Sequence, residues 1–468
     1  MAKFNREKVL RQLEFKRKWR SYSRYVYIAV PCVLCCLLCL YFAYSKFFVS
    51  EEQAVIRTTV GDFIYGDVVI SAYIDGEYSS TIPGKNDGYV VDKVSCDNGA
   101  VGKWNNDDWG LLTTNLSKRT KCNVYFKKVV SKVPDIIAQL DTTGKCPTMN
   151  ADGSVNVTAV EATDGYLCKA KDAYGDSYYY RGNVTNNYVK FADKYWRIVR
   201  INGDGTVRVI YDGTSAHANG ESSEDRQIGT SAFNSSYNDN AHVGYMYGAT
   251  GASMYAAAHA NTNDSTIKTY IDNWYKTNIL ETANEHYLAD NVFCNDRSIS
   301  TYTTSSNTKL GYGTTSTYYR WACGPWEGTN CGNMKMMLTC PQQNDAFTVS
   351  DTSNGNGALT YPVGLLSTDE VVLAGGWTAS NSGYYLYSGQ VWWASTPGSF
   401  FDSNARVRFV NSDGNASFGF YVKDSYGVRP VFNLKAEVLA EGSGIASDPY
   451  RLSLTSWQFF LKSYKYWF

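Results

Sequence analysis

The sequence predicts a strand-rich α+β chain with an N-terminal transmembrane helix, a small β-rich domain and a large mixed domain that has few helices. Three observations support this prediction. Residues 25–45 form an uncharged, apolar stretch. The rest is rich in Tyr, Thr, Ser, Asn and Gly, which suit short strands and tight turns. After the stretch, only two segments carry a helix signal, one an apolar face at the helical period and the other a capping box. At 468 residues, the chain is long enough for two or three domains.

The predicted transmembrane helix covers residues 25–48 and follows a basic tail, residues 1–24. The tail carries nine Lys or Arg residues against two Glu residues, and 25–45 is a run of 21 residues without a charge. About 20 apolar residues in a helix cross a bilayer core of roughly 30 Å. Because basic residues mark the cytoplasmic side, we expect a single-pass cell-membrane protein with a cytoplasmic N-terminus and an extracellular C-terminus. The alternatives are a buried soluble helix and a signal peptide cleaved after 43–45, which would also export the rest.

The charge balance gives no reason to expect a nucleic-acid partner. Lys plus Arg and Asp plus Glu each number 44, and the chain is somewhat acidic after the basic tail. Nucleic-acid-binding domains instead concentrate basic residues in a patch or stripe. The expected partners are therefore the membrane, through the single span, and a glycan, cell-wall or protein ligand outside the cell.

Eight of the 12 cysteines follow the predicted span, in a setting where disulfides persist. The other four lie inside the span, as apolar residues or acylation sites. None of the eight forms a CxxC pair, which disfavours a metal ribbon. Sequence-local pairing suggests four disulfides, with other connectivities still open: Cys96–Cys122, Cys146–Cys168, Cys323–Cys331 and Cys294–Cys340.

Residues 55–130 are predicted to form a small β-sandwich-like domain. Strand-like runs at 67–74 and 121–126 are separated by Asp-Gly and Asn-Gly pairs, which reach the positive φ of hairpin turns. The polar segment between Trp104 and Trp109 is either a binding loop or a turn whose flanking aromatic residues belong to the packing. Residues 131–165 show little periodicity and are predicted to be a connector.

Residues 166–452 are predicted to form the main domain. Its clearest element is a hairpin, 195–201 and 206–211, around an Asn-Gly-Asp-Gly turn. Two helices are predicted, one after Ser265 and one after the capping box Ser367–Glu370. Asn-x-Asp-Gly tetrads starting at 150 and 411 lack the further acidic ligands of an EF-hand loop, so we interpret them as turns.

The sequence lacks the common catalytic signatures. Its four histidines are not at zinc-binding spacings, and no P-loop, nucleophile elbow or strand-linked GxGxxG occurs. We therefore expect no catalytic residue, metal or cofactor. A sequence does not show whether two carboxylates lie at the separation that a glycosidase needs, so a glycan hydrolase stays an alternative.

Motifs near the C-terminus follow a characteristic order. A capped helix in 367–376 (STDEVVLAGG) precedes 391–397 (VWWASTP), a variable aromatic and Asn-rich stretch follows, and 427–430 (GVRP) leads into a closing strand. In this order the chain resembles the C-type-lectin-like superfamily, in the branch of formylglycine-generating-enzyme-like (sulfatase-modifying-factor-related) domains and anchored surface proteins of Gram-positive bacteria. Together with 195–211 and 293–297, the resemblance extends over about 178–452 and implies a C-type-lectin-like head.

The resemblance implies that ligands meet the loops between the WW strand and the GVRP strand. Exposed aromatic rings beside amide, carboxylate and guanidinium groups suit sugars or protein surfaces. The alternative is that these loops are only a solvated surface. The residues nominated for ligand binding are Trp393, Phe400, Phe401, Asn404, Arg406, Asn411, Asp413 and Tyr421.

Two structural expectations concern the same motifs. Because neighbouring strand residues point to opposite faces, we expect one of Trp392 and Trp393 in the core and the other at the surface. Arg429 is interpreted as a structural arginine paired with a buried carboxylate, for which Asp296 and Asp369 are the candidates.

Two departures from the family bear on function. Nothing within 378–434 matches the EPN or QPD triplet and the WND strand of calcium-dependent lectins. The last cysteine, Cys340, precedes the core in which formylglycine-generating enzymes hold a redox-active pair. We therefore expect a scaffold without that chemistry: a membrane-anchored extracellular binding or adhesion module for a glycan, cell-wall polymer or protein. The alternatives are an extracytoplasmic enzyme of the formylglycine-generating-like branch, a glycan hydrolase and a structural envelope component.

The aromatic tail, 453–468, is either an accidental extension or a docking segment.

Overall fold

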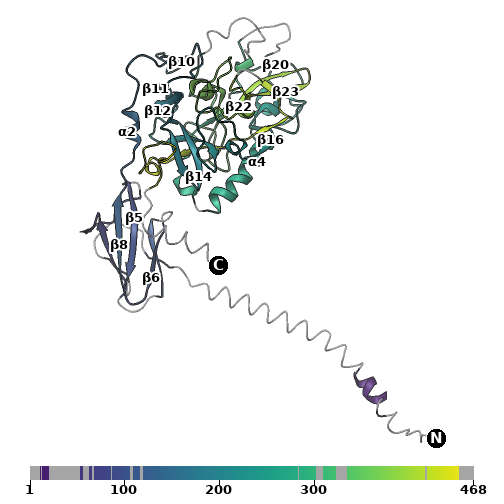
Figure 1. Cartoon of the computed structure of the whole chain (residues 1–468). Helices are drawn as coiled ribbons and strands as arrows, with labels where there is room; N and C mark the ends of the chain where they lie inside the picture. Colours follow the sequence, from purple (N-terminus) through teal and green to yellow (C-terminus); the bar gives the residue numbers. More distant parts are fainter. Residues whose placement is uncertain are drawn as a thin grey trace, which may run out of the picture. The chain divides into compact units, whose positions relative to one another are not determined.

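The computed structural model describes residues 11, 13–19, 53–55, 63–65, 68–85, 87–105, 109–115, 120–282, 284–301, 309–322, 335–416 and 419–452. The chain is strand-rich with few helices, as predicted, and divides into two compact units, Met1–Asp87 with Val91–Lys127 and Gly88–Val90 with Lys128–Phe468 (Figure 1). Within the described ranges, no helix has the length and apolar character needed to cross a membrane. The predicted span 25–48 and the tail 453–468 lie outside those ranges.

The first unit consists of two β-sheets. One has the strand order β2-β3-β8-β5 with β4 beside β3, and the other has the order β1-β7-β6. The runs predicted at 67–74 and 121–126 are β3 and β8, which pair in parallel, an arrangement that needs a long crossover and not a tight turn. The strands are β1 Gln53–Val55, β2 Phe63–Tyr65, β3 Val68–Ile74, β4 Glu77–Ser79, β5 Tyr89–Cys96, β6 Val101–Asn105, β7 Gly110–Thr114 and β8 Thr120–Lys128.

The paired tryptophans of this unit belong to its packing. The rings of Trp104 and Trp109 meet edge to face with centroids 5.4 Å apart, and Trp104 meets Phe126 of β8 at 5.2 Å. The indole nitrogen of Trp109 donates a hydrogen bond to the carbonyl oxygen of Pro83 at 2.5 Å. Such edge-to-face pairs add stabilisation beyond the area they bury, so these rings hold the unit together.

The first sheet of the second unit has the order β11-β12-β14-β15-β26, with β13 beside β14. The predicted hairpin is confirmed as β14–β15, and the strand after the GVRP motif, β26, closes the sheet by pairing with β15. The strands are β11 Gly165–Asp172, β12 Gly175–Gly182, β13 Tyr188–Phe191, β14 Lys194–Ile201, β15 Val207–Gly213 and β26 Val431–Leu434.

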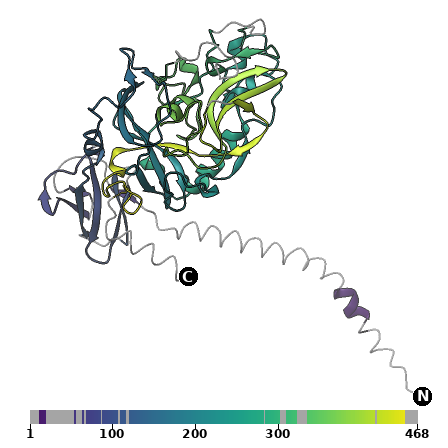
Figure 2. The same cartoon turned by 45° about the horizontal axis from the view of Figure 1, so that its top comes forward.

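The second sheet has the order β16-β25-β22-β23-β24, with β20 beside β22. Its largest part is the long hairpin of β22 and β23, which is drawn in yellow-green in Figure 2. The strands are β16 Thr230–Ala232, β20 Thr317–Tyr318, β22 Trp392–Phe401, β23 Asn404–Val410, β24 Gly419–Tyr421 and β25 Ser425–Gly427. Both sheets contribute to one hydrophobic core.

Short strand pairs and turns complete the second unit. The described residues also form three two-stranded pairs, the last of which joins segments far apart in the chain: β9 Thr148–Met149 with β10 Val155–Asn156, β17 Met246–Tyr247 with β18 Asn263–Asp264, and β19 Phe293–Cys294 with β21 Ala346–Phe347. The short helical turns are Glu224–Arg226, Asn240–Val243, Lys276–Leu280, Glu285–Tyr287, Arg320–Ala322, Gln343–Asp345 and Ala436–Val438.

Both predicted helices are confirmed. In α4 (Thr266–Tyr275), the hydroxyl of Ser265 accepts a hydrogen bond from the backbone N–H of Lys268, and in α5 (Thr368–Leu373) the capping box between Ser367 and Glu370 is complete. Trp274 of α4 packs on Trp196 of β14, with centroids 6.3 Å apart. Two short helices lacked a sequence signal, α2 (Val133–Ile137) and α3 (Tyr255–Ala258).

Three of the predicted disulfides are confirmed: Cys96–Cys122, Cys146–Cys168 and Cys294–Cys340. Cys96–Cys122 joins β5 to β8 within the first unit, and the other two lie in the second unit. The fourth predicted pair, Cys323–Cys331, lies outside the described residues.

The expected partners of Arg429 were wrong. Arg429 is buried and pairs with a buried carboxylate, as predicted, but the carboxylate is Asp212, at 2.8 Å. Asp296 and Asp369 instead pair with Arg320. The reason is topological, because the GVRP segment runs antiparallel to the end of β15, which carries Asp212.

Candidate functional site

The eight nominated residues separate into three groups, of which the first is buried. Trp393 has no exposed surface, its indole nitrogen donates to the carbonyl oxygen of Ser231 at 2.9 Å, and Phe400 is 1% exposed. The expectation that one of the two neighbouring tryptophans lies at the surface was wrong, because both faces of β22 are covered and Trp392 is also buried. Trp393 and Phe400 therefore have no surface to offer a ligand.

The second group, Asn411 and Asp413, forms the turn that follows β23. The backbone N–H of Asn411 donates to the carbonyl oxygen of Asn415 at 2.8 Å, and the Asp413 carboxylate accepts the Ser380 hydroxyl at 2.6 Å. These bonds are those of a turn docked on a neighbouring loop. Asn411 and Asp413 directly follow the last residue of β23, and Asn404 is the first residue of that strand, so the two places lie at opposite ends of β23.

The third group lies around the end of the β22–β23 hairpin. Directly paired residues on neighbouring strands share one face of a sheet. Ser399 of β22 pairs with both Tyr318 of β20 and Arg406 of β23, and Arg406 pairs with Tyr421 of β24. A row of side chains from four strands therefore crosses one face of the second sheet.

Around this row, aromatic rings and cations alternate. The Lys423 ammonium lies 4.3 Å from the ring centroid of Tyr237 and 5.7 Å from that of Tyr421. The Arg406 guanidinium carbon lies 5.1 Å from the Tyr421 ring and 5.8 Å from the Phe401 ring. Phe401 in turn stacks on Tyr318, with ring centroids 6.2 Å apart. We call this set the aromatic–cation ladder: Tyr237, Lys423, Tyr421, Arg406, Phe401 and Tyr318.

The two cations of the ladder have no counter-ion among the described residues. Neither Arg406 nor Lys423 forms an ion pair, and the Arg406 Nε is buried without a hydrogen-bond partner in the described part of the chain. Contacts with ring faces hold both cations, each worth about 0.5–1 kcal/mol at an exposed site. The ladder thus presents two oriented positive charges without consuming their hydrogen-bond donors.

Three residues of the ladder were missed by sequence reasoning. Tyr237, Tyr318 and Lys423 belong to separate loops and strands, and only the sheet brings them to the hairpin. The loop of Tyr237 is fixed there because its carbonyl oxygen accepts the backbone N–H of Ala405 at 2.7 Å. The one usable signal was the position of Lys423, two residues after the nominated Tyr421.

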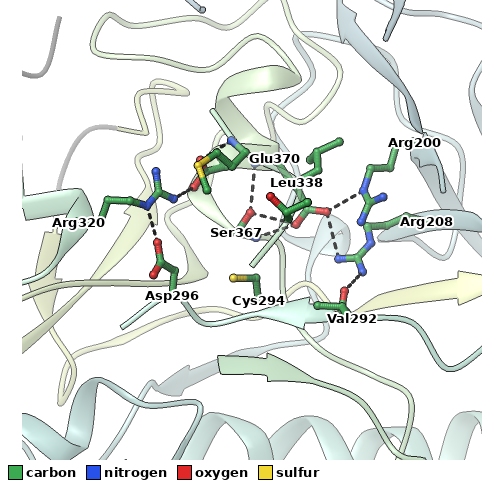
Figure 3. A pocket seen from close by; sticks show the side chains of 12 residues that line it. Arg200, Arg208, Val292, Cys294, Asp296, Arg320, Leu338, Ser367 and Glu370 are labelled. Atoms are coloured by element: carbon green, nitrogen blue, oxygen red, sulfur yellow. Dashed lines mark hydrogen bonds and ion pairs between the residues drawn. The ribbon is translucent and has the colours of Figure 1, made fainter. Parts of the chain in front are cut away.

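A second place with clustered charges is a cavity beside the start of α5, shown in Figure 3. Twelve residues line it, among them Arg200, Arg208, Arg320, Asp296 and Glu370. In Figure 3, Glu370 points toward Arg200 and Arg208, while Arg320 lies beside Asp296. The cavity measures about 10 Å³, near the lower limit of about 10–15 Å³ that a single water molecule requires.

The charges of this cavity are already neutralised by one another. Glu370 lies 3.2 Å from Arg200 and 3.1 Å from Arg208, and Arg320 pairs with Asp369 at 2.5 Å and also with Asp296. Burial opposes ionisation of Glu370, but Arg208 and Arg200 hold the pKa of its carboxyl below the ordinary value. Cys294, also on the wall, is bonded to Cys340. Each carboxylate that lines the cavity is therefore paired with arginine, and its one cysteine is in a disulfide and has no free thiol for thiol chemistry.

Comparison with known families found one match. Residues 334–436 match the model of a domain of unknown function, DUF6273. The matched segment is under a quarter of the chain and includes α5, the β22–β23 hairpin and all eight nominated residues. Neither the curated proteins nor the solved structures that were compared contain a match to the chain.

Proposed function

We propose that the protein is a membrane-anchored extracellular module that binds a glycan, cell-wall polymer or protein without catalysis, and that the aromatic–cation ladder is its binding face. The observation that carries this proposal is the pair of oriented, unpaired cations among aromatic rings. Aromatic residues and arginine are the side chains that dominate binding energy at recognition surfaces.

The location outside the cell is part of the proposal. It is supported by the apolar stretch 25–45 with its basic flank, and by three disulfides, which persist in oxidising compartments. The resemblance to C-type-lectin-like domains supports a binding role, because in that superfamily the same loops meet ligands. An enzyme of the formylglycine-generating-like branch is the second candidate, and the small size and paired charges of the cavity beside α5 favour the binding role over it.

The test is a binding screen with the full-length chain in detergent micelles on an array of glycans, wall polymers and surface proteins. We expect binding to at least one class, and we expect Tyr421→Ala to weaken it by about tenfold or more, equivalent to about 1.4 kcal/mol. Tyr195→Ala is the matched control, since the Tyr195 ring also lies under a lysine, Lys190, at 5.4 Å. Binding that survives Tyr421→Ala, or turnover of a ligand on the array, would overturn the proposal.

A further inference from the structure

We infer that the aromatic–cation ladder selects acidic polysaccharides, with Arg406 and Lys423 binding carboxylate or phosphate groups of one polymer and the phenols binding its hydroxyls. This inference rests on the proposed function, because it names the ligand class of the same face. Its support comes from three features of the face: the two cations have no counter-ion among the described residues, they lie close together, and uncharged hydrogen-bonding groups surround them.

Arg406 is unusual among the part-exposed arginines that the structure describes in the second unit, because Arg320 and Arg451 both pair with carboxylates. Arg451, a part-exposed arginine elsewhere on the second unit, pairs with both Glu441 and Asp448, at 3.5 and 2.8 Å. Arg406 and Lys423 have no such carboxylate in the described part of the chain, although Asp402 and Asp424 are near them in sequence. Charge complementarity therefore favours an anionic ligand over a neutral one.

The ring contacts hold the side chains of both cations in place before a ligand binds. A flexible Lys or Arg side chain loses conformational entropy when it binds, and prior immobilisation lowers this cost. Arg406 lies between the rings of Tyr421 and Phe401, and Lys423 lies between those of Tyr237 and Tyr421. The Arg406 Nε is buried, so the two terminal nitrogens of the guanidinium are the donors left for a ligand, and this planar pair matches the two oxygens of a carboxylate or phosphate.

The spacing of the cations favours a polymer. Both border the same ring, at 5.1 and 5.7 Å from the centroid of Tyr421, so they are no further apart than the sum of these distances. A single exposed ion pair contributes only about 0–1 kcal/mol. One acidic group would therefore bind weakly, whereas a chain that repeats the group can engage both cations and rebind from neighbouring units.

The uncharged groups of the face favour a sugar over an acidic peptide. The phenol oxygens of Tyr237 and Tyr421 make no hydrogen bond within the described residues. Asn404 uses its amide nitrogen on the carbonyl oxygen of Asp402, at 2.6 Å, which leaves its side-chain oxygen as an acceptor. Each repeat of a polysaccharide carries several hydroxyl groups, and each hydroxyl can both donate and accept, whereas an acidic peptide such as poly-glutamate has no hydroxyls and offers one backbone N–H and one carbonyl per residue.

The test measures affinities of the full-length chain for four probes of matched length: a polyuronate, a phosphate-bearing mannan, a neutral glucan and poly-glutamate. The variant is the double substitution Arg406→Gln with Lys423→Gln. The matched control is Lys190→Gln, since the Lys190 ammonium also lies over a tyrosine ring, 5.4 Å from the centroid of Tyr195. Near-ultraviolet circular dichroism checks that each variant is folded.

We expect an acidic polysaccharide to bind about tenfold or more tightly than the glucan, and the double variant to lose about tenfold of that affinity while Lys190→Gln loses none. Binding should also weaken in about 0.5 M salt. Comparing the affinities for the polyuronate and the phosphate-bearing mannan shows whether the face prefers carboxylate or phosphate groups. Equal binding of the glucan, with loss on Tyr421→Ala, overturns this inference and leaves the proposed function standing. A preference for poly-glutamate, or no binding of either acidic polysaccharide, also overturns it.

Discussion

At the scale of single residues, Asp212 organises the interior of the second unit. It is fully buried at the end of β15, 2.8 Å from both Arg226 and Arg429, with Arg197 at 3.8 Å. Burial lowers the pKa of Arg429 to about 9, even with Asp212 beside it. Three buried cations thus depend on one carboxylate, which is why the GVRP arginine is structural.

The substitution Asp212→Ala should destabilise the second unit by about 3–5 kcal/mol, because it leaves buried arginines without their counter-ion. Denaturant-induced unfolding of the full-length chain measures this change. The control is Asp176→Ala, which removes an exposed ion pair with Lys169 at 2.7 Å and should lower the stability far less, because solvent screens exposed pairs. Similar losses in both variants would contradict this role of Asp212.

His259 should make the second unit sensitive to mild acid. Burial lowers the pKa of its ring to about 3, with Arg297 adding to the effect, and Nε2 bonds to the carbonyl oxygen of Gly311 at 2.9 Å. The folded-state pKa of His259 lies below the ordinary value of about 6.5. The stability that the neutral ring contributes is therefore present in full above pH 6.5, and it is lost as the pH falls toward 3. By pH 5.5 the free energy of unfolding should have fallen by about 1.4 kcal/mol.

The measurement is denaturant-induced unfolding of the wild type and of His259→Gln across this pH range. The difference in unfolding free energy between the two should change by about that amount between pH 7.5 and 5.5, because the amide does not titrate. A difference that stays constant with pH would show that this histidine is not held neutral by the fold.

At the scale of elements, the β22–β23 hairpin has a two-residue turn with left-handed backbone. Asp402 and Ser403 have φ of 52° and 58°, a conformation that costs an ordinary residue about 1–2 kcal/mol and glycine almost nothing. Ser403→Gly should therefore raise the stability of the second unit by about 1 kcal/mol, and Ser403→Val should lower it. Thermal unfolding measures both.

The control for the hairpin is Ser412→Gly, in the turn after β23. Its backbone is outside the left-handed region, so glycine brings no relief there and should be neutral or destabilising. A gain on Ser412→Gly equal to that on Ser403→Gly would contradict the assignment of the turn.

Local sequence signals predicted these elements well. The Asn/Gly turn located the β14–β15 hairpin, and the Ser367–Glu370 capping box located α5. The alternation rule failed at Trp393, because it assumes that one face of a strand meets solvent. Phe233 and Tyr426 cover the Trp393 ring, with centroids 5.8 and 5.0 Å away. A strand that is buried on both faces gives no alternating pattern to recognise.

At the scale of the whole molecule, each unit has its own disulfides and buried residues, so each should respond separately to their loss. The pair Cys294–Cys340 spans 46 residues, and closing a loop of that length contributes about 4 kcal/mol in the chain-entropy account. Replacing both cysteines with alanine should lower the unfolding temperature of the second unit alone, as measured by calorimetry on the full-length chain. Replacing Cys96 and Cys122 should lower the unfolding temperature of the first unit alone. If either variant lowered the unfolding temperatures of both units together, the prediction would be wrong.

The binding face could be predicted only in part. Phe401, Asn404, Arg406 and Tyr421 were nominated from a continuous stretch, and the hairpin keeps them together. Tyr237 and Tyr318 come from segments far away in the chain and reach the face through the β20–β22 pairing and the Tyr237–Ala405 backbone bond. Such long-range pairings leave no local pattern, since any strand edge can accept them.

The most direct measurement of the proposed binding face is tyrosine footprinting of the full-length chain with and without a ligand found in the binding screen. Covalent labelling read by mass spectrometry reports the accessibility of each phenol. We predict that ligand protects Tyr237 and Tyr421 and leaves the part-exposed Tyr195 unchanged. Protection confined to other tyrosines, with Tyr237 and Tyr421 labelled as before, would contradict the account.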